Sequence, residues 1–553
     1  MKSNGNVRWF LIIVLLIVAN LILSSFFFRV DMTKENRYSL SEVSESALDT
    51  LAYPMFVTVY LDGDFPPDIR AFQDVLRTTL LEMKQYAHGN FDFEFVDPSS
   101  NPELQKQFQE LGFMPVPVKY VDVDETRFKN MWPLAAFRYK DYEQYVDLLK
   151  GASVPTAQGP NVNFQKAESD LEYKLMSSVL NLSRERRGIV GLVRGHGELP
   201  NELIQELGTE LVNSYNLVDF NMGSSYAGAA VSPDIDLLLI MQPVEAFSER
   251  DKYELDQYLM RGGSILWMLD YQKVDLDLFQ KVSTLSELYE LNLEDLFFKY
   301  GVKLNYDLVQ DVSSETVELF DEASQNFASH RWLFYPRYFE LPNHPVTRNI
   351  DAVMMRYASS IDTMPQAGVK KTVFLSSTTR SRTVQGRQFI DINQYVQSPP
   401  PANLFNRQGL IMGLMMEGVF ESLFTGREAP TDSLAPEKPT ATFGARNNPA
   451  SPGKMAIISD GAFPQPRNFR GRLQRVPFDN VDLVMNVIDY LAGDQALTEI
   501  RSKEVVARRL DRDKARDSAG SIRLLNLVLP NLLILLFGMI LFYARKRKYS
   551  RSV

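Results

Sequence analysis

The chain has 553 residues, of which 45% are apolar, with 59 Lys and Arg against 69 Asp and Glu and no Cys. This length predicts about three or four domains. The lack of Cys excludes disulfide frameworks, Cys-ligated zinc, iron–sulfur clusters and thiol nucleophiles, and we expect neither a cofactor nor a metal site.

Two apolar runs predict membrane anchors. Residues 9–28 and 524–543 each have the roughly 20 apolar residues that a helix needs to cross a bilayer. A cleaved signal peptide is the alternative for the first run, and a buried core helix is the alternative for the second. The first run is longer than a signal core and ends in three Phe, so we predict an uncleaved transmembrane helix at each end.

The charge is divided along the chain. Residues 1–29 carry +3 and residues 501–553 carry +9, which leaves −22 for residues 30–500 out of the total of −10. The positive-inside rule then places residues 1–8 and the basic tail 544–553 in the cytoplasm. We therefore expect a two-pass inner-membrane protein with a large periplasmic body. An acidic body argues against a nucleic-acid partner.

Residues 29–150 predict a small thioredoxin-like α/β domain. Strand patterns alternate here with helix patterns, at 56–61, 68–87, 91–96, 102–111 and 116–123. Pro115-Val116-Pro117 resembles the place where thioredoxin-like folds carry a cis-proline. A proline on an edge strand explains the same residues equally well. Without a CxxC motif, such a domain has no redox chemistry.

Residues 151–187 form a linker and a helix, after which a second, doubly wound α/β domain begins. Its first part is 188–274 and its last part is 454–495. Short apolar runs of the kind buried in parallel sheets mark its strands, at 188–193, 236–241, 264–269 and 455–458. Helix patterns follow them, at 200–215, 248–262 and 480–491.

A long insertion, 275–453, interrupts this second domain. Its stretch 425–453 holds five Pro among many small polar residues, which predicts a mobile loop. Residues 496–523 are rich in both charges and predict a helical juxtamembrane stalk that couples the body to the membrane.

Polar residues follow three of the predicted parallel strands, where open α/β sheets bind ligands. Gly195-His196-Gly197-Glu198 follows the first, and Asp270 and Asp460 follow later ones. We expect these side chains to converge in a small ligand-binding pocket. The alternative is that the glycines make a tight turn while His196 and the acids form local hydrogen bonds.

The motifs needed for catalysis are missing from the sequence. It has no nucleophile elbow, no Walker A loop and no HExxH pair, and its four His follow no metal spacing. We therefore predict that the protein is not an enzyme and that any ATP is hydrolysed by another subunit.

Several motifs in a fixed order give a specific resemblance. They are NRYSLS at 36–41, GHGE at 195–198, NHPVT at 343–347, MEGVFESLF at 416–424 and IRSK at 500–503. Together with the two apolar runs, they make the chain similar to the gliding-motility-associated ABC transporter auxiliary components, the GldG-like family. That family's middle domain resembles glutamine-amidotransferase-like folds, whose activity needs a Cys that this chain lacks.

The resemblance implies a partner ABC ATPase, a partner ABC permease and a role in gliding motility, often together with envelope secretion. A periplasmic protein or a glycan is the expected substrate. We expect Asn20, Asn526, Pro530 and Asn531 to contact the permease, because polar residues in membrane helices favour helix–helix contact. The alternatives are a structural scaffold without a small ligand and, least favoured, a hydrolase that uses His196 and Glu198.

Overall fold

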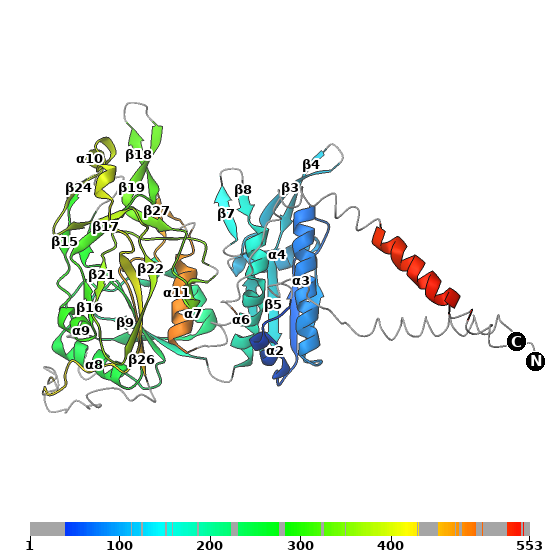
Figure 1. Cartoon of the computed structure of the whole chain (residues 1–553), viewed down its shortest axis with the longest axis horizontal. Coiled ribbons are helices and arrows are strands. Elements are labelled where there is room, and N and C mark those ends of the chain that lie inside the picture. Colours follow the sequence, from blue (N-terminus) through cyan, green and yellow to red (C-terminus); the bar gives the residue numbers. More distant parts are fainter. Residues whose placement is uncertain are drawn as a thin grey trace, which may run out of the picture. The chain divides into compact units, whose positions relative to one another are not determined.

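The computed structural model describes residues 39–493, residue 500, the helical stretch 528–543 and residue 546 (Figure 1). Within residues 39–493 it leaves out 112, 123–124, 150–151, 157–158, 185–186, 223–230, 276–282, 322–325, 349, 428–429, 431–451, 470–471 and 475–477. The chain up to Glu504 forms one compact unit, and Val505–Val553 forms another. Most of the predicted mobile loop, and all of the predicted stalk except Ile500, lie outside the described residues.

The predicted membrane topology is wrong. In the part of the chain that the structure describes, no helix combines the length and the apolar character needed to span a bilayer. This finding overturns both the fold class with a transmembrane helix at each end and the two-pass inner-membrane localisation.

The first predicted anchor and some of the predicted permease-contact residues lie outside the described residues. The run 9–28, which includes Asn20, lies outside the described residues, and so does Asn526. Pro530 and Asn531 lie in the helical stretch 528–543 and are exposed. What stands of the predicted fold class is that the chain is a mixed α/β protein.

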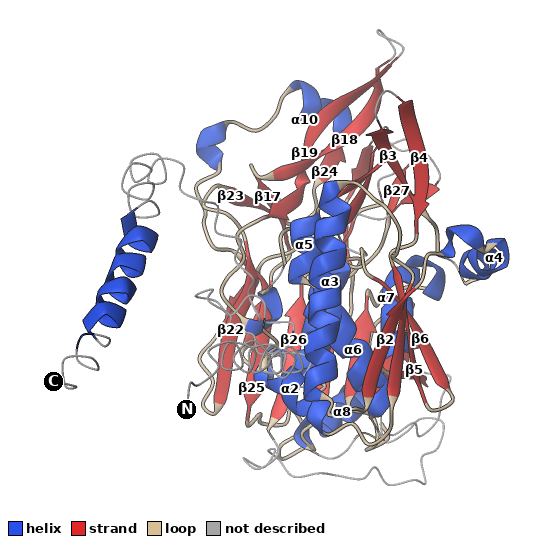
Figure 2. Cartoon of the chain, turned by 90° about the vertical axis from the view of Figure 1, so that its right-hand side faces the viewer, coloured by secondary structure: helices blue, strands red, loops and turns tan. Residues whose placement is uncertain are grey.

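A four-stranded sheet organises the first part of the chain, in the order β2-β1-β5-β6. Strand β1 (Met55–Val59) runs parallel to β2 (Phe91–Phe95) and antiparallel to β5 (Leu134–Tyr139), which pairs with β6 (Tyr142–Asp147). The helix α3 (Pro67–Tyr86), long and central in Figure 2, connects β1 to β2. The first residue of α3 is Pro67. Proline is favoured in the first turn of a helix, because the N–H that it lacks would have no hydrogen-bond partner within the helix.

Around this sheet the other elements complete a large apolar core and a small cluster in which Phe108 packs with Trp132 and Leu134. The helices are α2 (Glu42–Asp49), α4 (Pro102–Glu110), α5 (Phe164–Ser169) and α6 (Leu171–Ser183). Two hairpins pair β3 (Val116–Asp122) with β4 (Glu125–Met131) and β7 (Ser153–Thr156) with β8 (Gly159–Val162). Pro117 thus lies in a two-stranded sheet, and no peptide bond in the described ranges is cis, which supports the edge-strand explanation.

A nine-stranded sheet organises the second part of the chain. Its parallel half runs β10-β9-β11-β12-β26, which are the second, first, third, fourth and fifth of these strands along the chain. That order is one of the two common doubly wound arrangements. The bounds are β9 Ile189–Arg194, β10 Asn216–Asn221, β11 Leu237–Met241, β12 Ser264–Met268 and β26 Gly453–Ile458.

Helices cover both faces of the parallel strands. Figure 1 shows α7 (Gln205–Ser214) and α11 (Asn480–Leu491) on one side and α8 (Glu249–Met260) and α9 (Glu294–Lys299) on the other. Strand β11 is buried throughout, and its side chains alternate between two cores. Leu237, Leu239 and Met241 pack with the first pair of helices, and Leu238 and Ile240 pack with the second. Burial on both faces explains the unbroken apolar run.

The insertion extends this sheet and also forms small sheets of two or three strands. Strand β25 (Ile411–Gly418) pairs antiparallel with β26, and β21 (Ile361–Thr363), β16 (Val302–Leu304) and β22 (Val369–Ser376) continue from it. Further strands are β13 Gln272–Lys273, β14 Ser283–Leu285, β15 Glu287–Leu288, β17 Asp307–Asp311, β18 Ser314–Asp321, β19 Asn326–Tyr338, β20 Val353–Met354, β23 Ser381–Gln385, β24 Phe389–Asp391, β27 Arg467–Phe469 and β28 Arg472–Gln474. Helix α10 (Ile392–Gln397) and four 3-10 turns, Pro98–Ser100, Asn201–Leu203, Pro345–Thr347 and Ala402–Leu404, complete the described part of the fold.

Candidate functional site

The parallel strands bring the predicted site residues to one edge of the sheet, because parallel strands end on the same side. Gly195 follows β9, Asp270 lies two residues after β12, and Asp460 lies two residues after β26. They do not form one pocket, however. His196 and Glu198 belong to one group of contacts, and Asp270 and Asp460 belong to another.

The turn after β9 is tight and needs both of its glycines. Gly195 has φ 117° and Gly197 has φ 72°, a region that side chains disfavour. A Cβ on Gly195 would meet the Met222 carbonyl oxygen at 1.8 Å, and one on Gly197 would meet the Val244 side chain at 2.5 Å. The backbone at Val244 and Glu245 packs against this turn, because the His196 carbonyl accepts hydrogen bonds from the N–H groups of both residues.

The His196 ring is held on every side. It is 1% exposed and stacks on Phe247 with ring centroids 3.8 Å apart. Its Nδ1 lies 3.3 Å from Glu198 Oε1, and its Nε2 lies 3.2 Å from Asp251 Oδ2. Asp251 also completes the capping box of α8 with Ser248. This ring therefore joins the turn after β9 to the start of α8.

In this cluster a buried cation lies between two acidic side chains. Burial alone lowers the pKa of His196, but hydrogen bonds and attraction from Asp251 and Glu198 outweigh it and raise the pKa to about 9. Burial opposes the ionised form of Asp251, but the bonds from His196 and Ser248 hold its pKa below the ordinary value. A buried imidazolium between two carboxylates, with no open face, is a structural connection. This arrangement disfavours the hydrolase alternative.

Asp270 and Asp460 form a different kind of cluster. Gly461 N–H donates to Asp270 Oδ1 at 2.7 Å, and the Gln242 amide donates to Asp270 Oδ2 at 2.6 Å. Asp460 accepts from the Arg356 N–H at 2.7 Å and from the Ala462 N–H at 3.0 Å. Gly461 packs so closely on Gln242 that a Cβ there would lie 2.9 Å from the Gln242 Cα. The two carboxyl groups are thus fixed at the ends of neighbouring strands.

Negative charge is not fully balanced in this second cluster. Burial, and then the Asp270 carboxylate, raise the pKa of Asp460 to about 7, while Arg356 opposes the shift. Burial likewise raises the pKa of Asp270. The Arg356 guanidinium is turned to carbonyl oxygens, those of Ala462 and Gln465. Near neutral pH the two carboxyl groups therefore carry less than two full negative charges.

A cavity of about 320 Å³ opens beside Asp270. Six of the residues around it carry its chemistry: Gln242, Asp270, Gln272, Tyr289, Tyr335 and Arg356. Asp270 is 8% exposed, whereas Asp460 is fully buried behind it. A cavity of this size with convergent polar groups and shifted pKa values is the usual form of a ligand site. We take it as the candidate functional site.

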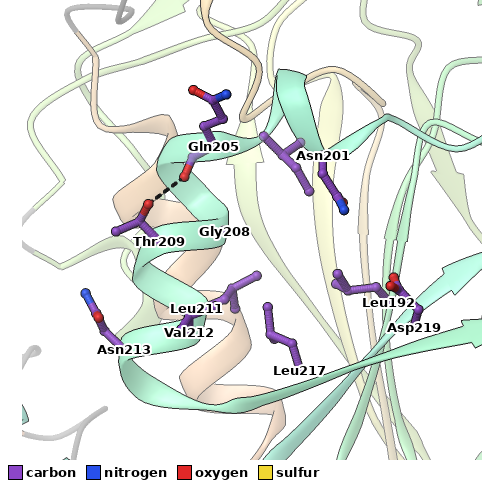
Figure 3. A pocket seen from close by; sticks show the side chains of 11 residues that line it. Leu192, Asn201, Gln205, Gly208, Thr209, Leu211, Val212, Asn213, Leu217 and Asp219 are labelled. Carbon is purple, nitrogen blue, oxygen red and sulfur yellow. Dashed lines mark hydrogen bonds between the residues drawn. The ribbon is translucent and has the colours of Figure 1, made fainter. Parts of the chain in front are cut away.

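A second hollow, of about 600 Å³, lies between α7 and β10. Figure 3 shows Leu192, Leu211 and Leu217 around it, with Asn201 and Gln205 at its rim. The Asp219 carboxylate at its edge is already bonded to Arg194, at 3.2 Å. It has an apolar floor without convergent polar groups, so it lacks the features that orient a small ligand.

Among the described residues, no group of three or more His, Asp or Glu side chains could hold a metal ion.

Sequence reasoning missed most of the residues that line the cavity beside Asp270. Asp270 could be found because it ends an apolar strand. Arg356 and Tyr335 come from the insertion, where no periodic pattern pointed to the sheet edge, and Gln272 lies two residues after Asp270. The one local signal was Gln242, which directly follows β11.

Helices on both faces of a parallel sheet and a polar cavity at its carboxyl edge define a mixed α/β protein of the kind that holds ligands at that edge. The family described as an ABC-type uncharacterized transport system matches residues 187–487, more than half of the chain. The chain therefore belongs to this family of ABC transport auxiliary components. Membership implies partnership with other subunits of an ABC transport system. The family is not a known enzyme family.

Other similarities add little about function. A domain of unknown function matches residues 34–138. An uncharacterized protein of Borreliella burgdorferi is 19% identical over 556 residues, which covers 97% of each chain. The solved N-terminal domain of mmIFT52 is 12% identical and matches 55% of this chain and 98% of its own, with a TM-score of 0.32. That score carries no argument.

Proposed function

We propose that the protein is a non-catalytic subunit of an ABC transport complex that binds a ligand in the cavity beside Asp270 and couples this binding to a partner ATPase and permease. The cavity is the observation that supports it. Auxiliary subunits without an ATP-binding loop must act through binding, and this cavity is the built polar site at the carboxyl edge of the sheet. Because the His196 ring is enclosed by its contacts, we assign that cluster a structural role.

Service to gliding motility is the finer part of this proposal, and it rests on the motifs at 36–41, 195–198, 343–347, 416–424 and 500–503. Deleting the gene in the source bacterium should abolish gliding, and the wild-type gene should restore it. If the deletion strain glides normally while transport of another substrate fails, the transport role stands and the gliding role does not.

The complex itself is tested by copurification. The full-length tagged chain, extracted in mild detergent from its own host, should bring an ABC ATPase and an ABC permease with it, as identified by mass spectrometry. Their repeated absence would sink the proposal. Asp270→Asn is the matched control, because it alters the cavity and should leave the partners bound. If the partners copurify but no ligand binds the cavity, the scaffold alternative replaces the ligand-binding one.

A further inference from the structure

We infer that the cavity beside Asp270 binds one ring of a neutral polyhydroxylated ligand, a sugar, with Gln272 donating to one of its hydroxyl groups and Asp270 accepting from another. This inference rests on the proposed function and names the ligand class for the same site.

Gln272 supplies an unused donor at the cavity. It lines the cavity and is 2% exposed, and its Nε2 has no hydrogen-bond partner among the described residues. On the other side of the amide, Ser286 Oγ accepts from the Gln388 N–H and donates to Gln272 Oε1 at 2.8 Å. The NH₂ group of Gln272 is thus a buried donor, and such donors normally find an acceptor.

Asp270 supplies the complementary acceptor. Each of its carboxyl oxygens receives one hydrogen bond, from Gly461 or from Gln242. A carboxylate oxygen has room for about two such bonds, so acceptor capacity remains on the side of the cavity. A hydroxyl group both donates and accepts. A ligand with adjacent hydroxyl groups can therefore accept from the Gln272 NH₂ group and donate to the Asp270 carboxylate at the same time. A simple cation cannot accept a hydrogen bond, and a simple anion cannot donate one.

Aromatic rings form another part of the wall. Tyr289, Tyr335 and Tyr357 line the cavity, and the rings of Tyr335 and Tyr357 meet edge to face with centroids 5.3 Å apart. Tyr357 has φ 51°, a strained value for a bulky residue, and its N–H is held by the Phe334 carbonyl at 3.0 Å. Strain of this kind collects at binding sites. An apolar ring face with a polar tip suits the C–H face and the hydroxyl rim of a sugar.

The charges favour a neutral ligand over a charged one. Lys273 and Arg356 line the same cavity as Asp270 and Asp275, so neither sign dominates. The Arg356 guanidinium already donates to the carbonyls of Ala462 and Gln465, which leaves no bidentate grip prepared for a phosphate or carboxylate. The volume, about 320 Å³, is near the lower end for ligand sites. That size suits one ring better than a length of polymer.

The test measures binding of sugars to the full-length purified chain. The probes are free hexoses, an N-acetylhexosamine and a 6-deoxyhexose, each at up to 10 mM, with a mixture of amino acids and inorganic phosphate as charged probes. Ligand-observed NMR detects binding, and calorimetry measures Kd. At least one sugar should bind, and Asp270→Asn and Gln272→Met should each weaken it by tenfold or more. Gln310→Met, which removes a buried amide of β17 that does not line the cavity, should leave Kd unchanged.

The outcomes separate the two proposals. If no sugar binds, or if Gln310→Met weakens binding as much as Gln272→Met does, the sugar inference is overturned. If an amino acid or phosphate binds instead and Asp270→Asn removes that binding, the sugar inference fails while the proposed ligand-binding subunit stands. The thermal midpoint of each variant must lie near that of the wild type, which shows that a lost signal comes from the cavity and not from unfolding.

Discussion

The turn after β9 and the paired ends of β12 and β26 lie along the same edge of one sheet, and both contain buried carboxylates. The first has become a closed structural connection. His196 lies between Glu198 and Asp251, and backbone groups fill the remaining space. The second keeps a cavity of about 320 Å³, with Asp270 at its wall and Asp460 behind it.

The two regions differ in how completely their polar groups are paired. At the first, the imidazolium lies between two carboxylates and is stacked on Phe247, so both ring nitrogens have partners. At the second, the Arg356 guanidinium donates to carbonyl oxygens, and the NH₂ group of Gln272 has no hydrogen-bond partner among the described residues. Position at the carboxyl edge is therefore insufficient to define a ligand site in this fold. Incomplete pairing next to open space is the better indicator.

The largest expected effect follows from opening the closed region. His196→Ala leaves Glu198 and Asp251 buried without their cation, which should lower the free energy of unfolding by about 3–5 kcal/mol. Urea denaturation measures it. His88→Asn is the control, because the His88 side chain is 74% exposed, and it should change stability by no more than about 0.5 kcal/mol. A loss below about 1 kcal/mol for His196→Ala would show that the ion cluster does not hold this region together.

The pH dependence of stability should distinguish the two regions. Asp460 has a folded pKa of about 7, above its ordinary value, so its contribution is fully present below about pH 4 and is lost as the pH rises through 7. His196 has a folded pKa of about 9, so its contribution is fully present below about pH 6.5 and is lost as the pH rises through 9. Denaturation at each pH should therefore show stability falling in two steps.

The Asp270→Asn variant tests whether the lower of these two steps comes from Asp460. Removing the Asp270 charge lowers the pKa of Asp460, and each unit of that shift corresponds to about 1.4 kcal/mol. The lower step should move to a lower pH while the step near pH 9 stays in place. Asp170, whose pKa burial raises to about 6, contributes equally to both proteins and cancels in the difference. If the lower step does not move, the charge of Asp270 is not what raises the pKa of Asp460.

A smaller effect should come from Gln272. Replacing it with Met removes a buried donor that has no partner, at the expense of one bond from Ser286, so the ligand-free protein should become more stable by about 1 kcal/mol. Gln310→Met also removes an amide donor that has no partner among the described residues, but it costs a bond from a charged donor, since Gln310 Oε1 accepts from Arg382 at 2.6 Å. Bonds to charged groups contribute about 1.5–3 kcal/mol, so Gln310→Met should instead lower stability by about 1 kcal/mol. Thermal unfolding of both variants without ligand measures the difference. A loss for Gln272→Met would indicate that its amide is already satisfied.

The smallest effect is expected at the hollow between α7 and β10. Val212 is 58% exposed there, so Val212→Ser should change the free energy of unfolding by less than about 0.5 kcal/mol. It should also leave sugar binding unchanged. Copurification of the ATPase and permease with this variant is the decisive measurement. A loss of either partner would show that this hollow is a docking surface for the ATPase or the permease.

Much of the regular structure could be predicted from sequence periodicity. The run at 236–241 became β11, Leu237–Met241, and the helix expected at 480–491 is α11, Asn480–Leu491. In both cases local pattern and burial agree. The anchor at 524–543 was predicted from the apolar composition and the length of the run, and no helix of the described residues is long and apolar enough to span a bilayer. Strand β25 was missed because its partner β26 follows only after residues 419–452.

The candidate site could be predicted only in part, for a physical reason. Asp270 and Asp460 end apolar strands, which is a signal within a few residues. Asp251 is joined to His196 across 55 positions in sequence, and Arg356 is joined to Asp460 across 104. No local pattern encodes such contacts. The expected single pocket therefore separated into a structural cluster and a cavity.

The order of the strands also has a consequence for how the chain is made. Strands β12 and β26 are neighbours in the sheet, yet residues 269–452 separate them. At ribosomal speeds of about 5–20 residues per second, the edge of β12 waits roughly 10–40 s for its partner. An apolar strand with a free edge is a template for wrong pairing. The nascent chain should therefore need a chaperone during that interval, and its folding should be completed only near the end of translation.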